Sequence, residues 1–198
     1  MMAVLRSILL LGLGALVLFV MQHNTPGYGD ITSPIAIRGK AGERVEGHAF
    51  AYGAANVHLA RVVKTESFGR VRDYSSSGVW LIIEGAAVAK KESLTLLSAE
   101  WLSPGGIRYA LSQRFSTMRG GYLPTERLEP GLPKPVLIAF ELPETAIKGG
   151  RLLIARSALT PLGEELWIDL DQKAQLEIKP SITLARGSGS MPWTLAAK

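Results

Sequence analysis

The sequence predicts an all-β domain, specifically an antiparallel β-sandwich, preceded by one N-terminal transmembrane helix. Two patterns predict this architecture: an uncharged apolar run near the N-terminus, and many short β-rich runs after it, separated by Gly and Pro. No later stretch shows ten or more residues with helical periodicity. The 198 residues are 47% hydrophobic, which excludes a largely disordered chain, and the 21 Gly and 11 Pro favour a chain with many turns over a helical bundle.

The apolar run Ser7–Met21 contains no charged side chain, and we assign residues 1–22 to a signal anchor. The twenty residues from Ala3 to Gln22 would span about 30 Å as a helix, which matches the hydrocarbon core of a bilayer. No site with small residues follows the run, so we expect the helix to stay attached. A cleaved signal peptide and a buried helix of a soluble protein are the alternatives.

The basic residues around the run predict its orientation. Arg6 precedes the run, and the next Lys or Arg after it is Arg38. The positive-inside rule then places the N-terminus in the cytoplasm and the C-terminal domain outside it. We therefore expect a single-pass protein of the cell membrane, with its domain in the periplasm if the cell is Gram-negative.

Composition divides the rest of the chain into three parts. Residues 23–42 are rich in Gly and Pro and predict an extended linker. Residues 43–178 form the predicted β-sandwich domain, which has an ordinary size for one domain. Residues 179–198 include the Gly/Ser run at 187–190 and predict a flexible C-terminal tail.

Within the domain, the run Gly78–Ala89 is almost continuously apolar, which is typical of a central strand covered on both faces. The turn Ser103–Gly106 predicts a hairpin, and Pro143 ends a further strand. The strands are expected at 57–64, 78–89, 94–102, 107–111, 135–142, 150–156, 165–170 and 174–179. The expected core comprises Val79, Leu81, Ile83, Leu96, Val136, Ile138, Phe140, Leu153 and Trp167.

A combination of short motifs in this domain resembles a known bacterial pattern. A glycine turn leads to Tyr109, Leu128-Glu-Pro-Gly131 forms a corner, and a strand ends in Phe140-Glu-Leu-Pro143. Residues 43–170 are thereby similar to the extracytoplasmic immunoglobulin-like domains of unknown function that carry a telomeric-repeat-binding-factor-2-like label. The resemblance implies an immunoglobulin-like sandwich held outside the membrane by an anchor, with no assigned catalytic residues. The chain departs from the pattern because it has a helical anchor and no lipid-bearing cysteine.

The sequence indicates no catalytic, cofactor-binding or metal-binding residue. The chain has no cysteine, which excludes disulfides, thiolate metal sites and a cysteine nucleophile. His48 and His58 fall in neighbouring predicted strands, but no third ligand stands near them. The glycine pairs lack the Lys-Ser/Thr of a phosphate-binding loop, and the net charge of +5 is too thinly spread for nucleic acid.

The sequence therefore favours a membrane-anchored, non-catalytic module that binds or assembles with a protein partner in the cell envelope. Two alternatives stay open. One is an extracytoplasmic enzyme whose site is assembled from scattered residues, and the other is an accessory subunit of a membrane complex.

The candidate interaction loop spans residues 113–127, which is long for a connection in a compact sandwich. Its basic, aromatic and sulfur-containing side chains predict a surface patch that contacts a protein or the anionic membrane surface. Alternatively, Phe115 and Tyr122 lie in the core while the arginines are merely solvated. The candidate residues are Arg114, Phe115, Met118, Arg119, Tyr122 and Arg127.

Overall fold

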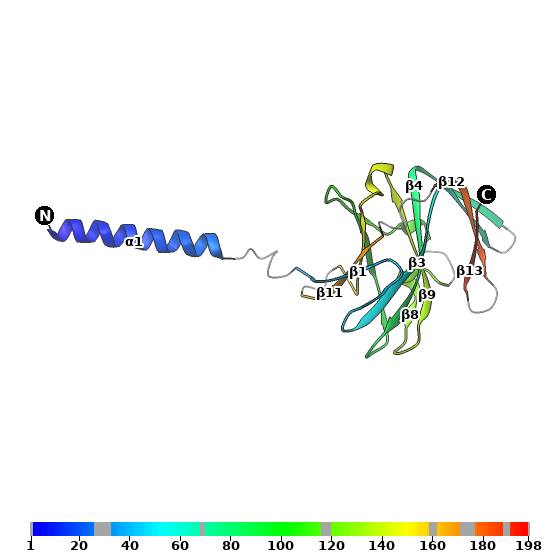
Figure 1. Ribbon diagram of the computed structural model, residues 1–198, viewed down its shortest axis with the longest axis horizontal. Coiled ribbons are helices and arrows are strands. Elements are labelled where there is room, and N and C mark those ends of the chain that lie inside the picture. Colours follow the sequence, from blue (N-terminus) through cyan, green and yellow to red (C-terminus); the bar gives the residue numbers. More distant parts are fainter. Residues whose placement is uncertain are drawn as a thin grey trace. The chain divides into compact units, whose positions relative to one another are not determined.

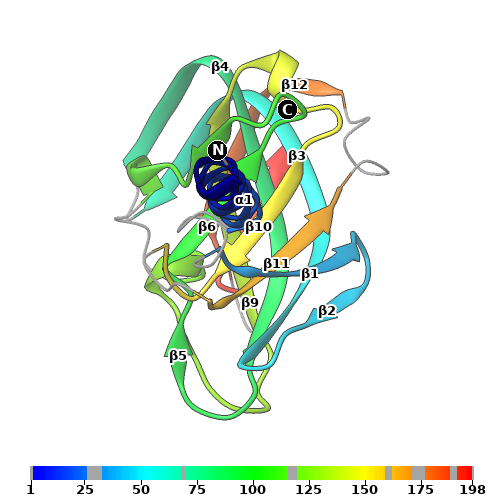
Figure 2. The ribbon, with the colours of Figure 1, turned by 90° about the vertical axis from the view of Figure 1, so that its left-hand side faces the viewer.

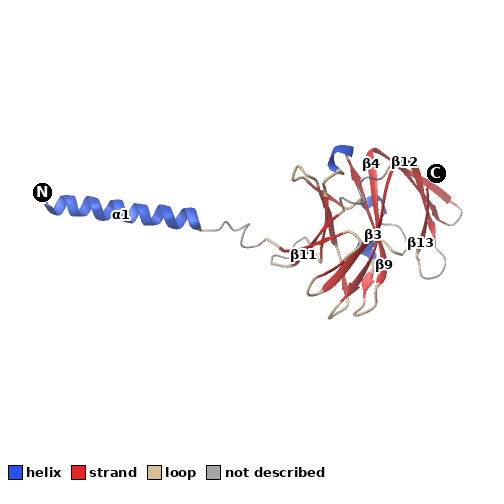
Figure 3. Ribbon diagram, in the orientation of Figure 1, coloured by secondary structure: helices blue, strands red, loops and turns tan. Residues whose placement is uncertain are grey.

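The computed structural model describes residues 2–25, 33–67, 70–115, 120–158, 162–170, 177–187 and 191–197. The chain divides into two compact units, Met1–Ser33 and Pro34–Lys198. The first contains helix α1 (Met2–Asn24), and the second is a mostly β domain with short 3-10 turns (Figures 1 and 3).

Helix α1 is long and apolar enough to cross a membrane. Its segment Val4–Asn24 has a mean hydropathy of 2.5, and its large apolar side chains are exposed rather than buried against protein. The side chains of Asn24 and Thr25 donate hydrogen bonds to the carbonyls of Val20 and Met21. These bonds satisfy acceptors that the end of a helix otherwise leaves without partners.

The β domain is built on two main sheets, which we call sheet A and sheet B. Sheet A has the strand order β1-β11-β10-β6-β7. Its strands are β1 (Ile35–Lys40), β11 (Glu164–Asp169), β10 (Arg151–Ala155), β6 (Ser98–Leu102) and β7 (Arg108–Ala110). Figure 2 shows β1 beside β11 at one edge of this sheet.

Sheet B has the strand order β13-β12-β3-β4-β9, with β2 paired to β3. Its strands are β2 (Arg44–Glu46), β3 (Phe50–Ser67), β4 (Arg70–Ala89), β9 (Lys134–Leu142), β12 (Ile178–Arg186) and β13 (Trp193–Ala197). The smaller elements are β5 (Leu94–Thr95), β8 (Arg127–Leu128), η1 (Gln113–Phe115), η2 (Leu123–Thr125) and η3 (Glu144–Ala146). Strands β5 and β8 pair with each other.

The two sheets pack on a shared core. The ring centroids of Trp101 on β6 and Phe140 on β9 lie 6.4 Å apart, which joins sheet A to sheet B. Strand β4 is buried on both faces, as its continuous apolar run predicts, because Val79–Ile83 are all at most 1% exposed. On its second face, the Trp80 ring meets Phe115 of η1 edge-on at 5.0 Å.

Most of the expected core is confirmed. Eight of the nine residues named from the sequence are buried, and the exception is Trp167. Strand register places Trp167 and Leu153 opposite each other and opposite Glu100, on the face of sheet A away from Trp101. Trp167 is only partly buried there, and the guanidinium of Arg38 lies over its ring at 5.9 Å.

Three expectations are corrected by the structure. The sheets are mixed rather than antiparallel, because β1 runs parallel to β11 and β12 runs parallel to β3. Strand β1 occupies part of the expected linker 23–42, and β12 and β13 occupy much of the expected flexible tail 179–198. Strands β1 and β12 pair with partners far away in the chain, which local composition does not reveal, and β13 then pairs with its neighbour β12.

Candidate functional site

The aromatic residues of the candidate loop are part of the core. Phe115 is 1% exposed and Tyr122 is 2% exposed. Their ring centroids lie 6.4 Å apart, and the Tyr122 hydroxyl donates a 2.6 Å hydrogen bond to the carbonyl of Ser112. Neither ring is therefore an exposed side chain of a surface patch. Met118 and Arg119, the other two central candidates, lie outside the described residues.

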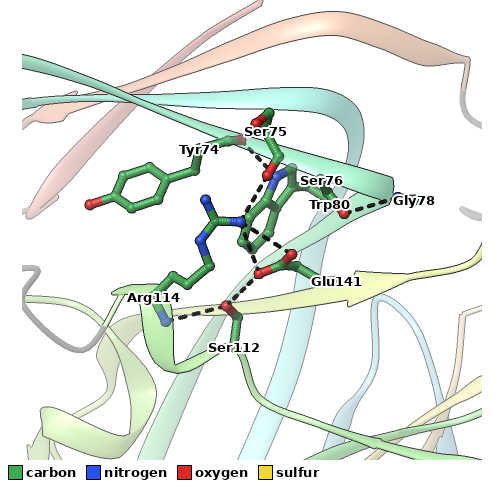
Figure 4. Close-up of polar contacts among 8 residues, drawn as sticks. All are labelled: Tyr74, Ser75, Ser76, Gly78, Trp80, Ser112, Arg114 and Glu141. Carbon is green, nitrogen blue, oxygen red and sulfur yellow. Dashed lines mark hydrogen bonds and ion pairs between the residues drawn. The ribbon is translucent and has the colours of Figure 1, made fainter.

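Arg114 holds the start of this loop against sheet B (Figure 4). Its guanidinium lies 5.3 Å from the ring centroids of both Tyr74 and Trp80. Its Nη1 also donates to the carbonyl of Ser75 at 2.8 Å and forms an ion pair with Glu141 at 3.3 Å. These intramolecular contacts make Arg114 a structural anchor, although its side chain stays 41% exposed.

Arg127 has the most exposed side chain among the described candidates. Its side chain is 73% exposed and pairs with Glu129 at 3.1 Å. The described candidates therefore do not form one continuous surface patch, because two are buried, one is anchored and Arg127 stands apart on β8.

The two domain histidines lie apart and have different partners. His58 Nε2 is 3.0 Å from Glu84 Oε2, and both side chains are largely buried. His48 is exposed, with its Nε2 2.6 Å from the Nζ of Lys91. Among the described residues, no group of three or more His, Asp or Glu side chains could hold a metal ion.

A cleft of about 330 Å³ opens at the edge of sheet A. Strand β6 and the residue before it form one side, and the segment around β7, η1 and η2 forms the other. Its lining is mainly apolar, and Glu100 is the single charged residue among the described residues that line it. The lining residues are Leu97, Ser98, Ala99, Glu100, Ala110, Leu111, Gln113, Tyr122, Pro124, Thr125 and Ala158. A volume near the lower end of the range for ligand pockets suits one or two side chains of a partner.

The charge at the cleft comes from three side chains. Arg108 Nη1 pairs with Glu100 at 2.8 Å and with Glu165 at 3.1 Å. Glu165 is buried and also accepts a hydrogen bond from the indole of Trp167. The guanidinium of Arg108 therefore forms ion pairs with two carboxylates, and the trio of Arg108, Glu100 and Glu165 carries one net negative charge.

Sequence patterns did not indicate this cleft, although four of its lining residues lie in the candidate interaction loop 113–127, namely Gln113, Tyr122, Pro124 and Thr125. The cleft exists because β7 is shorter than β6, and strand lengths at an edge depend on tertiary contacts. Leu97 is 61% exposed, but one leucine in a chain with so many leucines does not stand out in the sequence.

Comparisons with known proteins assign no family. No family model matches the chain, and no curated protein matches it. Among solved structures, the chain is similar to the YjhA protein of Bacillus subtilis, with a TM-score of 0.47 and 14% sequence identity. The match covers 66% of this chain and 99% of that one. This likeness is distant and assigns no function.

Proposed function

We propose that this is a single-pass membrane protein whose β domain is a non-catalytic module that binds or assembles with a protein partner in the cell envelope. The observation that supports it most directly is α1, whose apolar side chains are exposed along a helix long enough to span a bilayer. Soluble proteins rarely expose apolar patches of that size, whereas membrane segments must.

The orientation is part of the proposal. With Arg6 before the apolar run Ser7–Met21 and no Lys or Arg after it until Arg38, the N-terminus lies in the cytoplasm. The β domain then lies outside the cytoplasm, in the periplasm of a cell with two membranes. An immunoglobulin-like relationship also stays a proposal. It is supported by the packing of two sheets on one core and by the Gly131 turn, with φ of 73°, that leads into β9.

The arrangement of acids and histidines favours binding over catalysis. The partly buried pair His58–Glu84 is not among the residues that line the cleft, and the cleft acid Glu100 already pairs with Arg108. A general acid or base must reach the substrate within hydrogen-bond distance, and this pair does not face the described cleft. An accessory role in a larger membrane complex is compatible with the same anchor and cleft.

Photo-cross-linking of the full chain in its native membrane tests the binding role. We would place a photoreactive side chain at Leu97, which lines the cleft, and at Leu132 as a control, since Leu132 is similarly exposed but lies outside the lining. Cross-links to one discrete protein from Leu97, but not from Leu132, are the expected result. Equal patterns from both positions, or none from Leu97, would contradict the proposal.

A further inference from the structure

The cleft lies where sheet A lacks a strand. All five residues of β6 pair with β10, but β7 pairs only with the last three, Glu100 to Leu102. Within the described part of the chain, no strand therefore continues the line of β7 beside Ser98 and Ala99. Both residues line the cleft.

The gap is fixed by the chain that follows β7. After Ala110 the backbone turns toward sheet B, where the Ser112 N–H donates to the carbonyl of Ala139 at 2.9 Å. The Tyr122 hydroxyl bonds the Ser112 carbonyl, which holds the turn in place. Because both bonds are buried at or near the core, β7 cannot extend along β6 without breaking them.

The walls of the gap suit the side chains of an extended peptide. Leu97, Leu111 and Pro124 supply apolar surface around the two open residues of β6. Successive side chains of a strand point to opposite faces, so every second residue of an added strand would face the same wall. Edge strands recognise peptides in this manner, with backbone pairing for affinity and alternate side chains for selectivity.

The negative charge beside the gap favours a partner with a positively charged side chain. Arg108 is shared between Glu100 and Glu165, and Glu100 is the more exposed of the two acids, at 26% against 6%. The net negative charge of the trio is therefore presented at Glu100, in the lining of the cleft. A basic side chain on a partner would complement it.

We propose that the cleft binds an extended polypeptide segment that adds to β6 beside Ser98 and Ala99, inserts an apolar side chain next to Leu97, and places a basic side chain near Glu100. This inference rests on the proposed binding function and names the chemistry of its partner.

The test uses the full chain in nanodiscs of uncharged phosphatidylcholine and the peptide acetyl-Thr-Leu-Thr-Lys-Thr-amide, followed by NMR. The expected result is a saturable shift of the Ser98 and Ala99 amide signals and of the Leu97 and Leu111 methyl signals. Replacing the lysine of the peptide by glutamate should weaken binding about tenfold. N-methylation of alternate peptide nitrogens should abolish binding, because it removes backbone donors.

Two pairs of protein variants test whether the peptide binds at the cleft. Glu100→Gln should remove the preference for lysine over glutamate, whereas Glu92→Gln, at an exposed acid outside the lining, should keep it. Leu97→Ser should weaken binding, whereas Leu132→Ser should not. All four positions are at least partly exposed, and one- or two-dimensional spectra report whether each variant is folded.

The inference is overturned if the lysine peptide causes no saturable shift at Ser98 and Ala99 up to a concentration on the order of 10 mM, or if the N-methylated peptide binds equally well. Cross-linking of a partner at Leu97 without any peptide response would leave the binding function standing and reject only the strand-addition mode. Failure of both experiments would reject the two together.

Discussion

The indole Nε1–H of Trp193 donates a 2.6 Å hydrogen bond to Oε1 of Glu84, although the two residues are 109 positions apart. The other carboxylate oxygen of Glu84 accepts from Asn56 at 3.2 Å and lies 3.0 Å from His58 Nε2. Trp193 is 2% exposed, and its ring lies over Gly121, where a Cβ would collide with it. One carboxylate thereby joins β13, near the C-terminus, to β3 and β4.

Glu84 should make the β domain sensitive to acid. The hydrogen bond from His58 is the main cause that lowers the pKa of Glu84 below its usual 4.5, with Trp193 and Asn56 adding to it against the effect of burial. A lowered pKa means that the unfolded chain binds more protons, so stability is present above pH 4.5 and falls as the pH drops through the pKa of the folded state.

The matching variant is Glu84→Gln, which we expect to cost about 1–3 kcal/mol near neutral pH and to flatten the loss of stability below about pH 5. Urea unfolding followed by tryptophan fluorescence measures this, because α1 contains none of the four tryptophans. An acid dependence as steep in the variant as in the wild type would show that other carboxylates cause it.

Arg114 and Arg127 should respond differently to charge reversal. Arg114→Glu removes the stacking on Tyr74 and Trp80 and places a second carboxylate beside Glu141, so we expect a cost of about 1–3 kcal/mol. Arg127→Glu, at a 73% exposed side chain, should change stability by less than about 0.5 kcal/mol. Equal effects in urea unfolding would mean that the stacking contributes nothing.

The hydroxyl of Tyr52 is buried and has no hydrogen-bond partner among the described residues. Burial raises its pKa, which keeps the phenol protonated. Because Tyr52→Phe removes an unsatisfied polar atom and keeps the ring, we expect stability to stay within about 0.5 kcal/mol of the wild type or to rise. A loss of more than about 1 kcal/mol in the urea midpoint analysis would reveal a partner for this hydroxyl.

Phe140 should be among the most costly core positions. Its side chain is completely buried and contacts Trp101 across the two sheets. Phe140→Ala should therefore lower the free energy of unfolding by about 3–5 kcal/mol. Exposed Leu132→Ala is the matched control and should be nearly neutral. A small effect at Phe140 would argue that the two sheets do not share this core.

Local patterns in the sequence predicted β4, β9 and the turn between β6 and β7, because an apolar run or a turn motif is formed by residues adjacent in the chain. The apolar runs at 78–89 and 135–142 fall in β4 and β9, which pair directly with each other, with β9 as the outermost strand of sheet B. The Ser103–Gly106 turn joins β6 to β7, and Gly106 has the positive φ of 82° that such a turn requires.

The same patterns failed where structure depends on distant partners. Strand β12 contains Pro180 and a mixed sequence, and it forms by parallel pairing with β3, more than a hundred residues earlier. Phe115 and Tyr122 have the composition of an interaction surface, yet the Phe115 ring packs edge-on against Trp80 of β4 and the Tyr122 ring packs against Phe115, so both belong to the core. The cleft depends on where β7 ends, which follows from the Ser112–Ala139 hydrogen bond rather than from any motif.

Accessibility of single cysteines tests the central claim most directly, since the natural chain contains no cysteine. One cysteine would replace exposed Leu132 in the β domain, and in a second protein one cysteine would precede Met1. A membrane-anchored, extracytoplasmic domain predicts that an impermeant maleimide labels the membrane-retained Leu132→Cys protein in intact spheroplasts, and labels the N-terminal cysteine only after permeabilisation. Labelling of Leu132→Cys only after permeabilisation would contradict the account.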